Sequence, residues 1–201
     1  MTRVGRTPQK PHPRVQFEQA GAGIGLLTLL ALAACTPEAT PGPEVPAIAY
    51  CDGVREWDAQ HGALEEEVLV LVNERRAEGA ICGSDEEFPP APELQMDPAL
   101  RCAARVHALD MGAQDYFNNL DPEGVDYSER AQRAGYAGNA VGQIIGSTHR
   151  EADQLVTALM GSTGLCRTLM DPEARAFGMG YAPASEAEYP YYWTQVYGDR
   201  E

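Results

Sequence analysis

Five cysteines constrain this chain more than any other feature of its sequence. Cys35 directly follows an apolar N-terminal stretch, whereas the other four lie within residues 51–166. An even number of cysteines in an exported domain predicts two disulfides, because an oxidising compartment keeps such bonds formed. None of the four forms a C-x-x-C pair, so their spacing gives no support for a zinc site. These residues (Cys51, Cys82, Cys102 and Cys166) allow three pairings, and spacing alone does not choose among them.

The N-terminus has the organisation of a secretory signal peptide. Four basic residues precede an apolar stretch at residues 24–32, which is too short to span a bilayer. The stretch ends in Leu32-Ala33-Ala34-Cys35, which resembles a bacterial lipobox. We therefore expect residues 1–34 to be a lipoprotein signal peptide and Cys35 to carry the lipid, since several acyl chains give stable anchoring. The alternative is an ordinary cleavable signal with an incidental cysteine.

The charge of the chain limits its partners. Its net charge is −15, which disfavours nucleic-acid binding through a basic surface. Removal of residues 1–34 takes away four basic groups and one acidic group and leaves a net charge of −18. Such a chain would not adhere to anionic lipid headgroups, so the lipid must supply the membrane attachment. Thr36 after the cysteine is not the aspartate that commonly retains lipoproteins at an inner membrane, which favours an outer membrane if the organism has one.

Composition divides the remaining chain into a tether and a domain. Residues 35–60 begin with a stretch rich in proline and small residues, which predicts a lipid-anchored tether with little capacity to fold. Residues 61–201 contain the periodic patterns of a folded domain. Gly79 supplies a helix stop, Asp97 and Pro98 form a helix start, and Thr148 to Glu151 match a capping box. The predicted elements are helices at 63–78, 97–111, 128–134 and 148–160, and strands at 141–145, 177–181 and 192–197.

The order of these elements predicts the fold class. Helices come before the final two strands, which a polar loop joins as an antiparallel hairpin. Without strict alternation of helix and strand, the pattern indicates an α+β layered domain.

Several sequence words in this order resemble the CAP superfamily (cysteine-rich secretory proteins, antigen 5 and pathogenesis-related 1 proteins), in its short bacterial form with an SCP-like domain. The matching segments are Leu71 to Arg76, Ala103 to Met111, Tyr116-Phe117, Arg133 to Tyr136, Phe177 to Ala182 and Tyr192 to Gln195. The resemblance covers about residues 64–198. It implies a three-layer α-β-α sandwich with a small antiparallel sheet and a surface cleft. Cysteines of bacterial relatives match Cys82 and Cys166, so the resemblance pairs these two and leaves Cys51 with Cys102.

The family's cleft holds two histidines and at least one glutamate, a set able to bind a divalent metal such as zinc. This chain departs from that set at each matched position: the residues are Asn119, Gln143 and Leu165. Amide side chains do not titrate near neutrality, and leucine offers no lone pair. Zinc prefers imidazole, thiolate or carboxylate ligands. We therefore expect a degenerate cleft with no metal, no cofactor and no catalytic residue.

Other candidate residues have structural interpretations. His107 lies on the apolar face of its helix, and we expect it to be hydrogen-bonded and partly buried beside the cleft. His149 is expected to be solvated, and nothing in the sequence assigns a role to His61. The carboxylates Asp110, Asp115 and Asp121 are interpreted as solvated surface groups. An aromatic group near the C-terminus could form a binding strip, but alternation along the strand favours core packing for at least one set: Tyr189, Tyr191, Tyr192, Trp193 and Tyr197.

These inferences favour an exported, envelope-anchored lipoprotein whose CAP domain binds or scaffolds without catalysing. Its expected partners are the membrane through the N-terminal lipid, and an envelope protein, peptidoglycan or lipid. One alternative is a lipid- or sterol-binding module with an apolar groove formed by Ile144, Ile145 and Leu165. The other is a hydrolase with a relocated site, for which the sequence offers no constellation.

Overall fold

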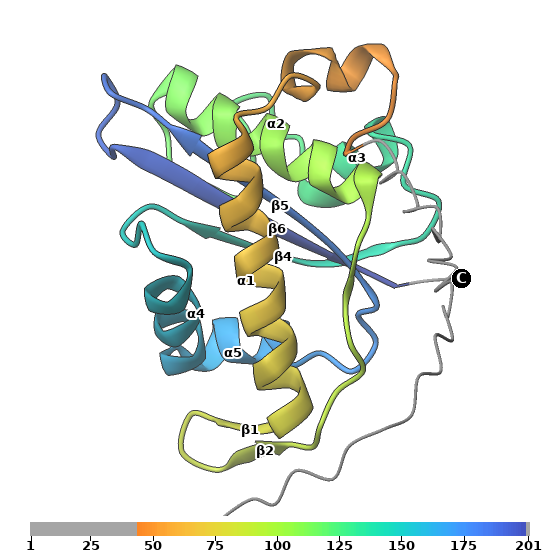
Figure 1. Ribbon diagram of the computed structural model, residues 1–201, viewed down its shortest axis with the longest axis vertical. Helices are drawn as coiled ribbons and strands as arrows, with labels where there is room; N and C mark the ends of the chain where they lie inside the picture. Colours follow the sequence, from red (N-terminus) through yellow and green to blue (C-terminus); the bar gives the residue numbers. More distant parts are fainter. Residues whose placement is uncertain (1–43, 200–201) are drawn as a thin grey trace, which may run out of the picture. The chain divides into compact units, whose positions relative to one another are not determined.

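The computed structural model describes residues 44–199 (Figure 1). The predicted signal peptide, Cys35 and the first part of the predicted tether lie outside these residues. The elements, in chain order, are η1 (Ala49–Val54), α1 (Ala59–Glu78), β1 (Ala80–Cys82), β2 (Glu86–Phe88), β3 (Gln95–Met96), α2 (Pro98–Gln114), α3 (Tyr127–Arg133), β4 (Ala140–Gly146), α4 (Ala152–Gly161), α5 (Thr163–Leu169), β5 (Ala176–Pro183) and β6 (Tyr191–Gly198). No helix within this part of the chain is both long enough and apolar enough to span a bilayer.

A four-stranded sheet forms the centre of the domain, in the order β3-β5-β6-β4. β5 and β6 form the predicted antiparallel hairpin, and β4 pairs antiparallel with β6. β3 pairs parallel with β5. The sheet is therefore mixed, whereas the resemblance implied an antiparallel sheet. β1 and β2 form a separate small hairpin. The sequence did not predict β1, β2 or β3, because strands of two or three residues are too short to show alternation.

Helices cover both faces of the sheet (Figure 1). α1, α4 and α5 share one apolar core with one face of β5 and β6, including Phe177, Met179 and Trp193. α2 and α3 pack with the other face, where Val196 and Tyr192 lie. The domain is therefore an α+β, three-layer α-β-α sandwich, which confirms the expected fold class.

Glycines in β5 let α2 lie directly on the sheet. A Cβ atom at Gly178 would be 2.0 Å from the backbone carbon of Leu100, and one at Gly180 would be 2.5 Å from the Cα of Arg105. The large residues that alternate with these glycines, Phe177, Met179 and Tyr181, face the opposite core. The alternation of glycine and bulky residues in β5 thus sets how closely each layer approaches the sheet.

The predicted starts of two helices had different outcomes. Asp97 caps α2 as expected, since its Oδ1 accepts hydrogen bonds from the backbone nitrogens of Ala99 (2.8 Å) and Leu100 (3.0 Å). α1 begins earlier than predicted, at Ala59. Asp58 caps it by accepting hydrogen bonds from the backbone nitrogens of the next turn.

The predicted capping box at Thr148 is wrong. α4 begins at Ala152, and its N-cap residue Glu151 makes no side-chain capping bond. The Thr148 hydroxyl contacts Nδ1 of His149 (3.0 Å) instead. Trp193 donates a hydrogen bond from its indole nitrogen to the carbonyl oxygen of His149 (2.6 Å), which holds this connection against β6 and keeps it out of the helix. α5, which follows the expected break after Gly161, was also not predicted.

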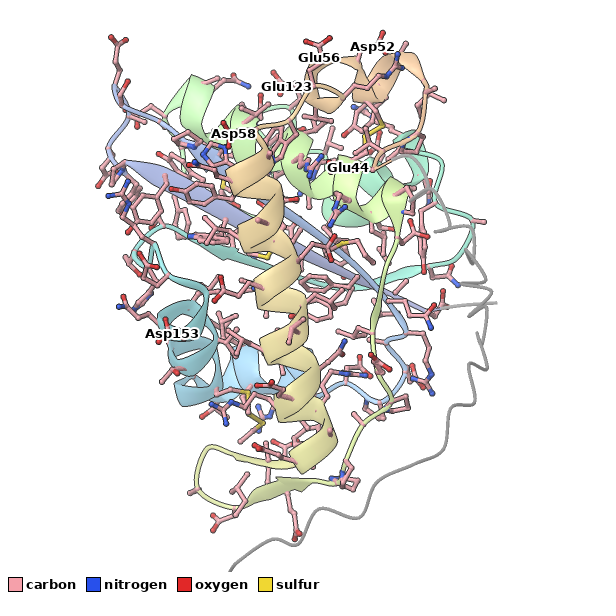
Figure 2. The ribbon with its side chains drawn as sticks, viewed as in Figure 1. Glu44, Asp52, Glu56, Asp58, Glu123 and Asp153 are labelled. Atoms are coloured by element: carbon pink, nitrogen blue, oxygen red, sulfur yellow. A yellow bond between two sulfur atoms is a disulfide. The ribbon has the colours of Figure 1, made fainter. Side chains whose placement is uncertain are left out.

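The predicted boundary between tether and domain at residue 60 is too late. Val45 and Val54 are buried in a cluster with residues of α2, and Cys51 forms a disulfide with Cys102. Glu44 accepts a hydrogen bond from the buried guanidinium of Arg105 at 3.0 Å (Figure 2). Residues 44–60 therefore belong to the folded domain.

Both predicted disulfides are present. Cys51 pairs with Cys102 and Cys82 pairs with Cys166, the two pairs that the family resemblance implied. The first joins η1 to α2, and the second joins β1 to α5.

Two charged residues of α1, Glu65 and Arg76, are buried. Glu65 is inaccessible and accepts hydrogen bonds from Arg105 Nη2 (2.7 Å) and the backbone nitrogen of Tyr181 (3.2 Å). Arg76 is also inaccessible, and it donates to four backbone carbonyl oxygens. The buried face of α1 is therefore partly polar. Both buried charged groups form hydrogen bonds, because an unpaired charge in the interior is costly.

Candidate functional site

The loop after α2 carries the first of the candidate cleft residues. α2 ends at Gln114. Its C-cap residue, Asp115, is a non-glycine residue in the left-handed region (φ 54°), and residues 116–126 then lead to α3. His107 on α2 contacts the carbonyl oxygen of Asn118 through Nε2 at 3.0 Å. Because that oxygen can only accept, Nε2 carries the proton. His107 thereby positions the loop that holds Asn119.

The imidazole of His107 is a neutral structural group. It is 1% exposed, and burial together with the nearby Arg130 guanidinium lowers its pKa to about 4. The hydrogen bond agrees with the expected structural role, and the burial is more complete than the partial burial expected. Tyr116 lies against the same ring, with its hydroxyl 3.3 Å from Nδ1, and donates to Asp110 Oδ2 at 2.7 Å.

The structure brings two of the three matched cleft residues together. Gln143 on β4 donates from Nε2 to the side-chain oxygen of Asn119 at 3.1 Å and approaches its backbone oxygen at 3.3 Å. The two amides therefore use hydrogen-bonding groups on each other, at positions where the resemblance implied metal ligands.

Arg130 of α3 completes this arrangement. Its Nη2 donates to the backbone oxygen of Asn119 (2.7 Å) and to Oε1 of Gln143 (2.9 Å), while Nη1 donates to the carbonyl oxygen of Val125 (2.6 Å). The residue is 2% exposed, and its Nε has no hydrogen-bond partner within residues 44–199. We call Asn119, Gln143 and Arg130 the amide–guanidinium network.

Arg130 was missed as a site residue, although the sequence contains a weak signal for its burial. It lies four residues before Ala134, an apolar residue directly after α3, so both occupy the same side of this turn, and the structure shows both buried. Arg133, which begins the family-like segment Arg133 to Tyr136, instead forms an ion pair with Glu129 at the surface.

The donor set of the network does not fit zinc. Neither Asn119 nor Gln143 offers an imidazole, thiolate or carboxylate, and both present oxygens to a guanidinium. A fixed positive charge at this position opposes the approach of a divalent cation. Among the residues that the structure describes, no group of three or more histidine, cysteine, aspartate or glutamate side chains could hold a metal ion.

Leu165 does not join the network. It lies on α5 and is partly buried against the core cluster formed by α1, α4, α5 and the sheet. Leu159 is buried in the same cluster. Leu159 is therefore a core residue, and Leu165 packs against the core.

The other sequence candidates have structural roles. Asp121 accepts a hydrogen bond from the backbone nitrogen of Val125 (2.7 Å), and Asp115 accepts one from that of Glu188 (2.6 Å), so these carboxylates stabilise loops. The ring of His61 lies edge-on to Tyr181, with centroids 4.9 Å apart. The aromatic residues of β6 are buried on both faces of the sheet, which leaves Tyr189 as the partly exposed member of the aromatic group.

Comparisons of sequence identify relatives of this chain. The family model named CAP, cysteine-rich secretory protein family, matches residues 70–197. The uncharacterized protein YkwD of Bacillus subtilis (strain 168) is 26% identical over 136 residues. This match covers 67% of the chain and 47% of YkwD, so the chain spans about half the length of that relative.

Comparisons of structure give the same fold. An extracellular SCP-domain protein from Bacillus anthracis has a TM-score of 0.57 at 18% identity, covering 72% of this chain and 45% of that one. An outer surface protein from Borrelia burgdorferi has a TM-score of 0.56 at 15% identity, with coverages of 68% and 92%. A cysteine-rich secretory protein from Staphylococcus aureus has a TM-score of 0.51 at 12% identity, with coverages of 71% and 40%.

Proposed function

The chain belongs to the CAP family of cysteine-rich secretory proteins, and from that premise we propose that it is an exported, lipid-anchored protein that binds or scaffolds an envelope component without catalysing a reaction. The amide–guanidinium network carries this proposal. At the positions where the family places titratable metal ligands, this chain has two amides that hold a buried arginine. Neither amide can act as a general acid or base near neutral pH.

Two further observations support export to the envelope. The domain has two disulfides, which persist in oxidising compartments. Its structural neighbours include an extracellular protein and an outer surface protein. The proposed partner is peptidoglycan, another envelope protein or a lipid. In this proposal, the acyl chains on Cys35 attach the protein to the membrane.

Zinc titration tests the loss of the family's metal site. We expect isothermal titration calorimetry of the purified chain to show no tight equimolar uptake of Zn²⁺, because the network has no suitable ligand set. The comparison protein is a variant with Asn119→His, Gln143→Glu and Leu165→His, which restores the family's ligand types. Equimolar binding by the unaltered chain that disappears in an Asn119→Ala, Gln143→Ala variant would refute the proposal.

Mass spectrometry of the mature N-terminus tests the anchor. After expression in a bacterium that processes lipoproteins, we expect the chain to begin at an acylated Cys35, and globomycin to block its maturation. The matched control is Cys35→Ser, which removes the thiol that accepts the lipid. A mature chain with an unmodified Cys35 contradicts lipid anchoring while leaving the argument about the cleft intact.

A further inference from the structure

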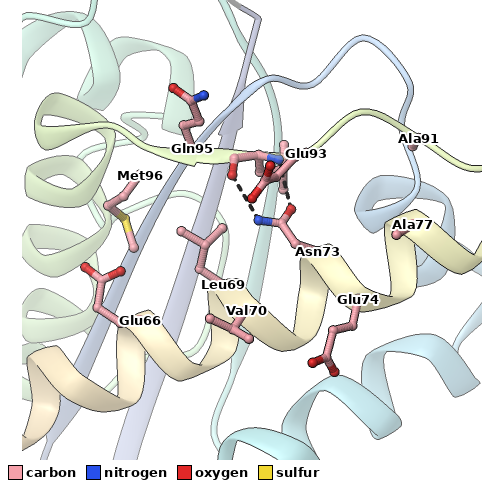
Figure 3. A pocket seen from close by; sticks show the side chains of 11 residues that line it. Glu66, Leu69, Val70, Asn73, Glu74, Ala77, Ala91, Glu93, Gln95 and Met96 are labelled. Atoms are coloured by element: carbon pink, nitrogen blue, oxygen red, sulfur yellow. Dashed lines mark hydrogen bonds between the residues drawn. The ribbon is translucent and has the colours of Figure 1, made fainter. Parts of the chain in front are cut away.

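An open groove lies between α1 and the segment 91–96, which leads into β3 (Figure 3). Its volume is about 650 Å³. The apolar part of its lining comes from both sides: Leu69, Val70 and Ala77 on α1, and Ala91 and Met96 opposite. We call this feature the α1–β3 groove.

The two walls of the groove are fixed to each other. Asn73 of α1 donates from Nδ2 to the carbonyl oxygen of Leu94 (3.0 Å), and its Oδ1 accepts from the nitrogen of Leu94 (2.8 Å), as Figure 3 shows. The next residue, Gln95, donates from its backbone nitrogen to Arg175 (2.9 Å) beside β5. The groove is therefore already formed before a partner binds. Binding would cost little free energy for ordering the two walls.

The apolar lining includes an unusually accessible side chain. Val70 is 57% exposed, although its neighbours Leu69 and Val68 are buried in the core. The branched side chain of Val70 lies on the outer surface of α1, where helices normally present polar residues. Contact with a partner would remove this apolar surface from water.

Glutamates surround the apolar lining. Glu66 and Glu74 lie on α1, and Glu93 lies on the opposing segment. Glu66 is paired with Arg101, whereas Glu74 and Glu93 form no ion pair within the described part of the chain. The chain as a whole has a net charge of −15, so the groove attracts cations and repels anionic ligands.

We propose that the α1–β3 groove binds a cationic peptide segment of a partner protein, with apolar residues between its lysines or arginines. The apolar residues would contact Val70 and Met96, and the basic residues would pair with Glu74 and Glu93. The groove follows α1 from Glu66 to Ala77, about 17 Å of helix. An extended segment of about five residues covers that length.

This binding site is separate from the amide–guanidinium network. β3 and β4 are the opposite edge strands of the sheet, and Gln143 belongs to β4. The inference goes beyond the proposed function, because it names a second surface and the chemistry of its partner. Zinc titration and N-terminal mass spectrometry do not bear on it, so the two proposals can fail separately.

Fluorescence anisotropy with labelled synthetic peptides tests the groove. The probe is a decapeptide of alternating lysine and leucine, titrated with the purified chain at low and physiological salt. The comparison peptides replace either every lysine with glutamate or every leucine with serine. We expect the lysine–leucine peptide to bind at least tenfold more tightly than both, with weaker binding at higher salt because the charges are exposed.

Paired variants locate the binding surface. We expect Glu74→Gln with Glu93→Gln to weaken binding at least fivefold, and Val70→Ser to weaken it similarly. Matched controls change the same residue types elsewhere on the surface: Glu123→Gln with Glu173→Gln for charge, and Ile81→Ser for exposed apolar area. Circular dichroism of each variant establishes that it is folded.

Three outcomes overturn this proposal. One is equal loss of affinity in the control charge variant, which would mean attraction to the net charge alone. The second is equally tight binding of the lysine–serine peptide or of the glutamate–leucine peptide. The first result would show that apolar side chains are not required for binding, and the other that positive charges are not required. The third is hydrogen-exchange protection by the bound peptide outside residues 66–77 and 91–96.

Discussion

At the scale of single residues, buried arginines connect segments that are distant in sequence. Arg76 donates from Nε to Pro92 (2.9 Å), from Nη1 to Leu169 (2.6 Å) and Asp171 (2.9 Å), and from Nη2 to Ala174 (3.0 Å), always to backbone oxygens. No ion pair involves this guanidinium within residues 44–199. The planar fork of arginine suits this set of acceptors, because its donors point in several fixed directions.

We predict that Arg76→Lys destabilises the domain by about 3 kcal/mol or more, since an ammonium group cannot reach all the carbonyl oxygens and leaves some of them unsatisfied. Chemical denaturation measures the change in the free energy of unfolding. Arg75→Lys is the matched control, because Arg75 is exposed and pairs only with Glu78 on the helix surface. Similar small effects of both substitutions would contradict a structural role for the buried guanidinium.

His107 gives the stability of the domain a pH dependence. Its pKa of about 4 in the folded state lies below the value near 6.5 of an unperturbed histidine, because burial and Arg130 disfavour the imidazolium. The groups that face it are Tyr116, Asp110 and Asp121. As the pH falls, the unfolded chain therefore takes up the additional proton at a higher pH than the folded chain does. The contribution of His107 to the free energy of unfolding is fully present above pH 6.5.

We predict that this contribution is lost progressively as the pH falls from 6.5 towards 4, by about 3 kcal/mol in total. Urea unfolding between pH 4 and 7 measures it, with His107→Gln as the comparison. The difference between the two proteins isolates the histidine from the carboxylates that also titrate. A difference that stays constant over this range would show that His107 titrates alike in both states.

At the scale of elements, close contact between α2 and β5 determines the arrangement of the layers. The alanines of α2 and the glycines of β5 both reduce side-chain volume at this contact. Arg105 on the same helix pairs with Glu65 of α1, so α2 contacts both the sheet and a helix of the opposite layer. A shift of α2 away from β5 would therefore also disturb the ion pair.

We predict that Gly178→Ala destabilises the domain by about 3 kcal/mol or more, because the added Cβ would lie 2.0 Å from the Leu100 backbone, which cannot move independently of α2. Thermal and chemical unfolding measure this effect. Gly164→Ala in α5 is the control, since no atom lies within 4 Å of its added Cβ, and alanine favours a helix by up to about 1 kcal/mol. Equal effects of the two substitutions would refute the steric argument.

At the scale of the whole molecule, the two disulfides hold segments that contribute little core of their own. The Cys51–Cys102 bond spans 51 residues and attaches η1 to α2, whereas Cys82–Cys166 spans 84 residues and attaches β1 to α5. η1 has six residues, and β1 has three. Cross-links of this length restrict the unfolded chain most strongly, which stabilises the folded state.

We predict that Cys51→Ala with Cys102→Ala costs about 4 kcal/mol and exposes residues 44–58 to proteolysis, because only non-covalent contacts, among them those of Val45, Val54 and Trp57 and the Glu44–Arg105 pair, would then hold this segment. Limited proteolysis with mass spectrometry locates the cleavage. Cys82→Ala with Cys166→Ala is the matched variant, and it should leave residues 44–58 protected. Protection of this segment after loss of the first disulfide would contradict the prediction.

Local sequence patterns were sufficient for the long elements of this domain. Period and caps predicted α1, α2 and the β5–β6 hairpin, because each signal depends on residues within a few positions of one another. The family's sequence words also placed Asn119 and Gln143 as members of one site, where the structure shows them in contact. Glu65 and Arg76 escaped this reasoning because the same residue types usually lie at the surface of a helix.

The sequence by itself determined the α+β class and the number of disulfides, since both follow from residue identity and local order. Its resemblance to the family determined the loss of titratable groups at the matched cleft positions. Only the tertiary structure decided that Arg130 donates hydrogen bonds to both Asn119 and Gln143, that Leu165 packs against the core away from them, and that residues 44–60 pack on α2. Each of these depends on contacts between segments far apart in the chain. Burial and the pairing of charges are properties of those contacts, so no local pattern contains them.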